Sequence, residues 1–127
     1  MEIYIATRKS TSQVKKLKTL IEKSLDDDKA LDIVTVDLAG KSSLGDYMII
    51  ASGTSQRHIT TLADHIVDKL ENTGLSGIPI EGRDSSDWVV VDAGNIIIHL
   101  FHPEARKHYN LEKMWSVTMP SQQEAAL

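Results

Sequence analysis

The apolar side chains along the chain follow two different periods. Residues 12–28 and the stretch after Ser55 place them three and four residues apart, which predicts two amphipathic helices. Ser55 is the expected N-cap of the second helix and Gly74 its expected C-cap, because these residue types suit those positions. A third helix is expected to begin near Pro103, since proline is favoured in the first helical turn, and to run through Tyr109.

Short runs rich in β-branched residues lie between these helices and predict strands. The last two runs are separated by a short connection that contains a glycine, which is typical of an antiparallel hairpin. Pro79 suits an edge strand because it has no amide hydrogen to donate. The expected strands are Ile33–Leu38, Tyr47–Ala51, Ile78–Ile80, Trp88–Asp92 and Ile96–Phe101. This order of elements predicts a single α/β domain in which helices flank a mixed β-sheet.

The composition narrows the classes of function. The chain has 127 residues, 41% of them hydrophobic, and a formal net charge of −4. Proteins that hold nucleic acid by its phosphates usually carry a basic field, so this charge favours a basic protein partner over RNA. The absence of cysteine excludes disulfides, thiolate zinc sites and a cysteine nucleophile. No apolar stretch has the length of a membrane span and no signal peptide is visible, so we expect a cytoplasmic protein without a membrane partner.

The segment Gly53-Thr54-Ser55 lies between an expected strand and an expected helix, where backbone amides can hold a phosphate. A turn of this kind also opens the active site of nucleotidyltransferases, which need paired carboxylates for magnesium. Asp92 is the natural first carboxylate, but Val90 and Gly94 occupy the positions where its partner would stand. A capping role for Ser55 is the simpler interpretation. A nucleotidyltransferase-like enzyme or a nucleotide-binding protein stays open as the alternative function.

Four of the five histidines form pairs that invite a metal-site interpretation. His99 and His102 are three residues apart, so on one strand they would point to opposite faces. His58 and His65 lie two helical turns apart, which is too far for one ion. Together with the missing carboxylate pair, these spacings predict no metal site and no cofactor.

Trp88 is the most informative single residue. On its predicted strand it shares one face with Val90 and Asp92, while Val89 and Val91 share the other. A face with tryptophan, valine and one acid is either a second core surface or a docking patch, because tryptophan is common in cores and enriched at binding hot spots. The residues alone leave both interpretations open.

Four groups of residues resemble, in order and spacing, the signatures of one protein family. They are residues 40–47 (GKSSLGDY); 53–58 (GTSQRH) with 63–65 (ADH); 81–82 (EG) with 88–94 (WVVVDAG) and 99–101 (HLF); and Arg106 with 109–112 (YNLE) and Trp115. The family is Iojap, the ribosome silencing factors. The resemblance runs from Leu31 to Trp115, so we expect the family domain at 31–115, a helical extension at 1–30 and a flexible tail at 116–127.

The resemblance implies a nucleotidyltransferase-like fold that lacks the catalytic metal site, which agrees with the missing carboxylate pair. It implies a non-enzymatic protein that binds ribosomal protein fourteen of the large subunit, with little direct RNA contact. The bound factor would block joining of the small subunit and repress translation under nutrient limitation.

The resemblance also assigns a docking surface, because the strand that begins at Trp88 carries much of it. Exposed acids near that strand would steer the protein toward a basic partner. An apolar docking face without its partner also favours a homodimer in the free protein. The expected partner-binding residues are Trp88, Val90, Asp92, Asp87, Tyr109, Leu111 and Glu112.

Two positions depart from the family pattern. Gly45 stands where the family usually has a residue with a side chain, and Asn95 replaces a common aspartate in the hairpin turn.

Overall fold

The structure is a computed structural model that describes residues 2–38, 45–83 and 87–109, and within these ranges the side chains from residue 12 to residue 107. The helices and strands follow one another in the predicted order, which confirms the α/β prediction. The described elements are α1 (Glu2–Asp27), β1 (Leu31–Asp37), β2 (Tyr47–Ser52), α2 (Gln56–Glu71), β3 (Ile80–Glu81), β4 (Trp88–Asp92), β5 (Ile96–Phe101) and α3 (Pro103–Tyr109).

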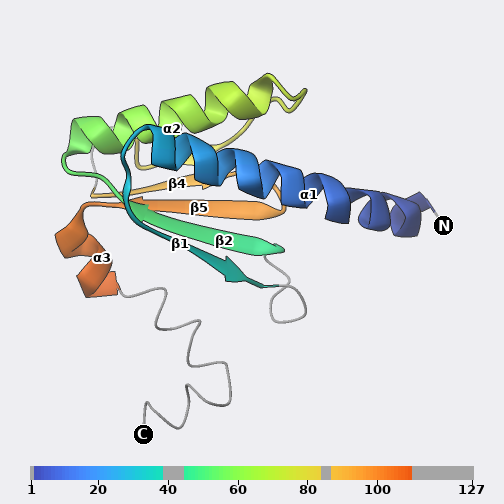
Figure 1. The fold of residues 1–127 in the computed structure, drawn as a ribbon, viewed down its shortest axis with the longest axis horizontal. Helices are drawn as coiled ribbons and strands as arrows, with labels where there is room; N and C mark the ends of the chain where they lie inside the picture. Colours follow the sequence, from blue (N-terminus) through green and yellow to red (C-terminus); the bar gives the residue numbers. More distant parts are fainter. Residues whose placement is uncertain (1, 39–44, 84–86, 110–127) are drawn as a thin grey trace, which may run out of the picture.

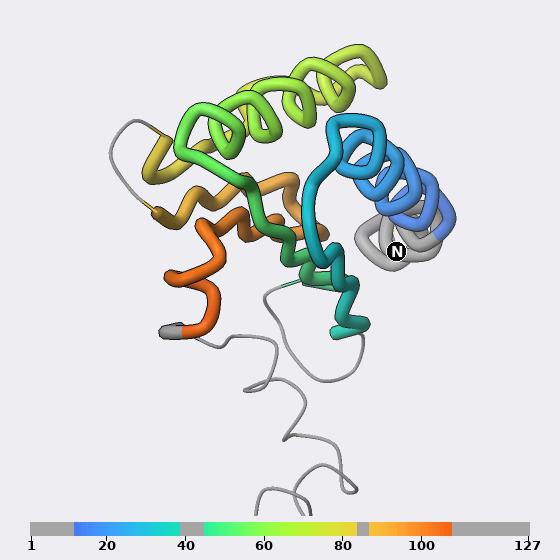
Figure 2. Tube along the Cα trace, turned by 60° about the vertical axis from the view of Figure 1, so that its left-hand side comes forward, coloured from blue at the N-terminus to red at the C-terminus, as the bar shows by residue number. Residues whose placement is uncertain are grey.

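The strands form one mixed sheet in the order β1-β2-β5-β4-β3. Strands β2 and β5 are parallel, whereas all other neighbours are antiparallel. The β4–β5 pair is the predicted hairpin. Figure 1 shows α1 and α2 over one face of this sheet, with α3 beyond the end of β5. Figure 2 separates the layers: the two long helices lie side by side on one side of the sheet, and α3 lies on the other.

The face under α1 and α2 holds the main hydrophobic core. Alternate strand residues such as Ile49, Val89 and Ile98 are fully buried there. They meet helical side chains such as Leu25 and Leu62, which are equally buried. Full burial of one such side chain contributes about 1.5–3 kcal/mol, so this layer supplies most of the stability of the fold.

Helix α2 begins as predicted and ends differently. Ser55 is its N-cap, and the Ser55 hydroxyl accepts a hydrogen bond of 3.1 Å from the amide of His58. The prediction of Gly74 as the C-cap is wrong. Asn72 is the C-cap, because its amide donates to carbonyls of the last helical turn. Gly74 follows in the turn with a φ of +106°, a conformation that glycine adopts without strain.

Helix α1 and strand β1 both begin earlier than predicted. Helix α1 starts at Glu2, whereas the predicted helix covered residues 12–28. Once its core-anchored turns exist, each further helical residue adds a backbone bond without a new nucleation cost. Strand β1 starts at Leu31, and an irregularity between Leu31 and Val34 interrupts its pairing with β2. Asp32 has a φ of +49° at this point, which residue-level periodicity does not reveal.

Strand β3 is an edge strand, as Pro79 indicated, but it covers Ile80–Glu81 rather than Ile78–Ile80. Pro79 cannot donate a backbone hydrogen bond. Its carbonyl instead accepts one from the amide of Asp92 at 3.0 Å.

Candidate docking surface

The sheet face that points away from α1 and α2 is formed around the β4–β5 hairpin. As predicted, Trp88, Val90 and Asp92 share this face, and Val89 and Val91 are buried on the helical side. We call it the outer face. On β4 and β5 it consists of the cross-strand pairs Trp88–Phe101, Val90–His99 and Asp92–Ile97.

A small second core lies on the outer face. Phe101 and Ile50 are fully buried there, and Met48 is buried in the same cluster. Trp88 packs against this cluster but remains partly exposed. Its side chain therefore contributes to packing and still presents surface to solvent, and the docking interpretation stays a prediction.

The polar edge of Trp88 is paired with a histidine. The indole Nε1 of Trp88 donates a hydrogen bond to Nδ1 of His99 at 2.9 Å. Burial lowers the pKa of His99 from 6.5 to about 4, so the imidazole is neutral near pH 7. Since Nδ1 accepts, the ring proton lies on Nε2. Sequence reasoning missed this pair, although the hairpin turn fixes a register that places His99 beside Trp88.

Exposed acids lie at both ends of β4. A side-chain oxygen of Asp92 accepts a hydrogen bond from the amide of Gly94 at 2.9 Å, which stabilises the hairpin turn. The backbone carbonyl of Asp87 accepts one from the amide of His102 at 2.9 Å. The Asp87 side chain is exposed. Tyr109 ends α3, but its side chain lies outside the described residues, as do Leu111 and Glu112.

The turn after β2 is occupied by contacts within the protein. The amide of Gly53 donates to the carbonyl of Phe101 at 2.9 Å, and the amide of Thr54 donates to Nδ1 of His58 at 2.9 Å. The His58 amide donates to Ser55. A Cβ atom at Gly53 would lie 2.7 Å from a side-chain carbon of Ile59, so glycine is needed here for close packing. These amides are thus already used, and the geometry favours the capping interpretation over a phosphate site.

The two helical histidines hold α2 against the end of α1. The ring nitrogen Nε2 of His58 is 2.9 Å from the carbonyl oxygen of Asp28, and Nδ1 of His65 is 2.6 Å from the carboxylate of the same residue. Within the described ranges, no group of three or more histidine, cysteine or acidic residues is arranged to hold a metal ion. The helical spacing predicted the separation of the two rings but not Asp28 as their shared neighbour.

The two departures from the family pattern are in contact. A Cβ atom at Gly45 would lie 2.8 Å from the backbone oxygen of Asn95. That oxygen already accepts a 2.7 Å hydrogen bond from the amide of Asp46. The side-chain amide of Asn95 donates to the carboxylate of Asp46 at 3.0 Å. An uncharged donor at position 95 is therefore matched to the acid beside it.

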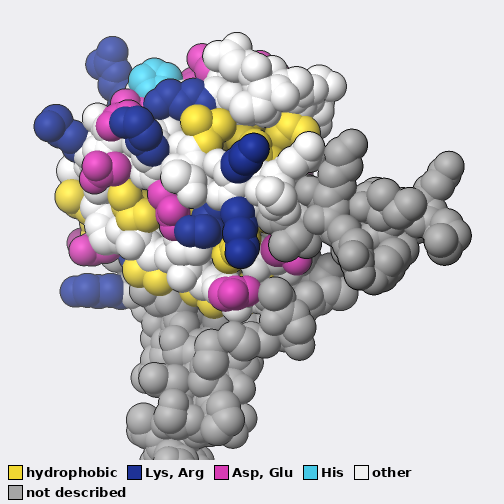
Figure 3. Space-filling view, turned by 45° about the vertical axis from the view of Figure 1, so that its right-hand side comes forward, with side chains coloured by type: hydrophobic (Ala, Val, Ile, Leu, Met, Phe, Trp, Pro, Cys, Tyr) yellow, Lys and Arg dark blue, Asp and Glu magenta, His cyan; other side chains and the backbone are white. Residues whose placement is uncertain are grey.

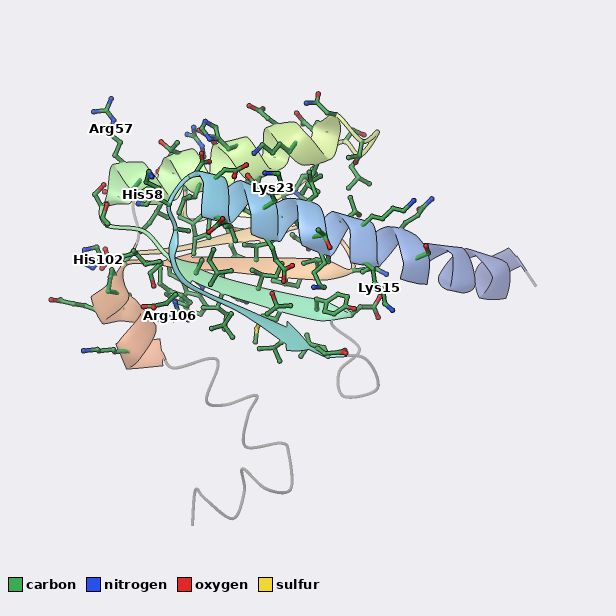
Figure 4. All side chains as sticks on the ribbon, in the orientation of Figure 1. Lys15, Lys23, Arg57, His58, His102 and Arg106 are labelled. Carbon is green, nitrogen blue, oxygen red and sulfur yellow. The ribbon has the colours of Figure 1, made fainter. Side chains whose placement is uncertain are left out.

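The surface charges are mixed. On the side seen in Figure 3, basic and acidic side chains are interspersed, with apolar patches between them. Figure 4 shows Arg57 projecting away from the start of α2. A depression of about 560 Å³ at the end of β2 contains Arg106 and Lys107 but also Asp32. Arg106 there donates to the hydroxyl of Ser52 at 3.0 Å, so that hydroxyl is held by a cation rather than activated by a base.

These features define a small α/β protein whose surface chemistry suits binding of a macromolecule rather than turnover of a small substrate. Among the described residues, no helix has the length and apolarity needed to cross a membrane. A family model described as "Ribosomal silencing factor during starvation" matches residues 5–126. The chain therefore belongs to the ribosomal silencing factor family.

Individual relatives agree with the family match. The ribosomal silencing factor of Zymomonas mobilis is 54% identical over 99 residues, which cover 78% of this chain and 74% of the relative. That of Haemophilus influenzae is 40% identical over 100 residues, covering 79% and 98%. A crystal structure of a protein from Chromobacterium violaceum superposes with a TM-score of 0.76 at 35% identity, covering 80% of this chain and 84% of that one.

These comparisons confirm the resemblance to the Iojap family, the single-domain mixed α/β fold and the assignment to translation regulation. The family consists of ribosome-binding regulators rather than enzymes, which confirms the non-enzymatic prediction. The chain is a ribosomal silencing factor by family. The residues of its docking surface stay a prediction.

Proposed function

We propose that the chain binds the large ribosomal subunit through ribosomal protein fourteen and thereby blocks association with the small subunit. The observation that carries the proposal is the outer face, where partly exposed Trp88 lies beside Val90. The family description, a silencing factor during starvation, supports repression of translation under nutrient limitation. Cytoplasm is the proposed location.

The chemistry of the outer face suits a basic protein. Tryptophan supplies a large contact area at the centre of an interface. The exposed carboxylates of Asp87 and Asp92 stand at the two ends of β4 and attract a basic partner over distance. The same acids and the net charge of −4 repel phosphates, so little RNA contact is part of the proposal.

The proposed mechanism is steric and needs no chemical step. The bound protein occupies a surface that the small subunit requires for joining. On the family resemblance, Tyr109, Leu111 and Glu112 are further partner-binding residues of the proposal. The domain that carries it is 31–115, with 1–30 as a helical extension and 116–127 as a tail. In the free protein, the outer face is also the proposed contact of a homodimer.

The test combines sedimentation with purified bacterial large subunits and a subunit-joining assay. We expect the protein to co-sediment with large subunits and to lower joining in a dose-dependent way. Trp88→Ala should weaken binding by about 2 kcal/mol or more, roughly 30-fold, as hot-spot residues do. Its stability loss should stay below the 3–5 kcal/mol typical of a fully buried tryptophan, because Trp88 is partly exposed.

Leu17→Ala is the matched control, because Leu17 is a partly buried apolar residue of α1 that packs on the helical side of the sheet, opposite the outer face. It should bind as wild type. Co-sedimentation with the small subunit alone, or with neither subunit, would contradict the proposal. Turnover of a nucleotide with magnesium in a parallel assay would instead support the enzyme alternative.

A further inference from the structure

Trp88 is held from two sides by residues of β5. Its rings stack on Phe101 with centroids 5.1 Å apart and an angle of 29° between the planes. They are tilted by 41° against the His99 ring, with centroids 5.7 Å apart. His99 and Phe101 are themselves nearly parallel, at 6.2 Å and 12°. The three rings form one cluster across the β4–β5 register, in which Trp88 lies opposite Phe101 and diagonal to His99.

Phe101 and His99 constrain different features of the Trp88 indole, its tilt and the direction of its Nε1 edge. Stacking on Phe101 limits the tilt of the indole but does not distinguish its two edges, because an aromatic face accepts either orientation. The hydrogen bond from Nε1 to Nδ1 of His99, at 2.9 Å, does distinguish them, since the indole has only this one donor. Rotation of the indole by half a turn would break that bond and leave Nδ1 of His99 without it.

We propose that His99 is a positioning residue of the docking surface: its Nδ1 holds the indole of Trp88 in one orientation, so that the outer face presents the same edge to every partner molecule. The inference rests on the proposed function, because it assumes that Trp88 contacts the ribosomal partner. A pre-set orientation removes the entropic cost of ordering the indole on binding. The low pKa of His99 supports the proposal, because a neutral ring keeps Nδ1 available as an acceptor near pH 7.

Two amide substitutions separate the hydrogen bond from the packing of the ring. His99→Asn places a carbonyl oxygen near the position of Nδ1 and keeps an acceptor for Trp88. His99→Gln carries the same group one carbon further, near the position of Nε2, and removes the acceptor from reach. His99→Leu keeps apolar volume without any acceptor. The two amide variants are matched in polarity, so their comparison decides the question even if His99→Leu does not fold.

Two measurements are made on each folded variant: the ¹H–¹⁵N resonance of the Trp88 indole, assigned with Trp88→Phe to separate it from Trp115, and the affinity for large subunits. We expect His99→Gln and His99→Leu to shift the indole resonance and to weaken binding about tenfold. His99→Asn should keep the resonance near its wild-type position and bind within about threefold of wild type. In the Trp88→Phe background, the His99 substitutions should have no further effect on affinity.

The outcomes distinguish failure of the inference from failure of the proposed function. If Trp88→Ala weakens binding but His99→Gln and His99→Leu bind as wild type, His99 is a packing residue only. If the indole resonance does not move in these variants, the hydrogen bond does not set the orientation. If His99→Asn loses as much affinity as His99→Gln, the imidazole ring itself is required and the positioning role is wrong. Wild-type binding by Trp88→Ala overturns both the inference and the docking role of Trp88.

Discussion

The two faces of the sheet differ in burial and in chemistry, although adjacent residues of the same strand form them. Under the helices, Val89 and Val91 of β4 are fully buried among apolar side chains. On the outer face, Trp88 and Val90 of the same strand are only partly buried, and Asp92 is exposed. The strand side chains buried on the helical face are apolar, so their packing depends mainly on complementary volume. The outer face combines a stack, a hydrogen bond and surface acids, which is the chemistry of recognition rather than of stability alone.

The largest effect that separates the two faces should come from Leu62→Ala. Leu62 of α2 is fully buried in the main core, so its truncation leaves a cavity and should lower the free energy of unfolding by about 2–5 kcal/mol. Chemical denaturation measures this change. The folded variant should bind large subunits as wild type does, in contrast to Trp88→Ala. A tenfold loss of affinity in fully folded Leu62→Ala would show that the two faces are not independent.

A smaller effect should appear as a pH dependence that arises on the outer face. Burial lowers the pKa of His99 to about 4, whereas an unfolded histidine titrates near 6.5. The unfolded state therefore binds a proton first as the pH falls. The stability linked to the neutral ring is fully present above pH 6.5 and is lost as the pH falls toward 4. The loss should reach about 1–2 kcal/mol after discounting for solvent near the ring.

Denaturation of wild type and His99→Asn at pH 7, 5.5 and 4.5 measures this difference. Carboxylates common to both proteins contribute equally, so the gap between the two curves reports the histidine. We expect the stability advantage of wild type to shrink as the pH falls through this range. Parallel curves for the two proteins would mean that His99 is not held neutral by the fold.

The smallest effect should come from the hairpin turn, where the chain departs from the family pattern. Asn95→Asp replaces a donor to the Asp46 carboxylate with a second negative charge. Because position 95 is exposed, we expect a loss of only about 0.5–1 kcal/mol, reduced further at high salt. Thermal melts at low and high ionic strength measure it. Asn95→Ser, which adds no charge, is the control. If both variants lose the same stability and the loss does not depend on ionic strength, charge repulsion is ruled out as the cause.

Local patterns predicted the β4–β5 hairpin to the residue, because two apolar runs rich in β-branched residues and the glycine-containing connection between them set the bounds of both strands. They also predicted Ser55 as a cap, since its hydroxyl acts within one helical turn. They failed where the cause lies outside the segment. The extension of α1 to Glu2 depends on turns anchored elsewhere, and the irregular start of β1 near Asp32 leaves no trace in residue type.

For the candidate site, too, local patterns predicted which residues share a strand face but not the contacts between strands. The period of two placed Trp88, Val90 and Asp92 on one face, and the structure agrees. The hydrogen bond between Trp88 and His99 leaves no signature in the spacing of the histidines along the chain. It depends on the pairing across the hairpin, whose register is set by the turn length. The alternation of residues along a strand predicts which side chains share a face. It does not predict which of two side chains donates a hydrogen bond to the other.

The parallel pairing of β2 with β5 has a consequence for how the chain acquires its fold. Residues Tyr47–Ser52 must wait for Ile96–Phe101, which lie far along the chain, before the middle of the sheet can close. Contacts between such distant segments carry a large loop-closure cost and slow folding. During synthesis, β2 can pair with β1 early, but its other edge stays open until the hairpin has left the exit tunnel. A chain that acts on ribosomes thus completes its sheet only after Ile96–Phe101 have emerged from the ribosome that makes them.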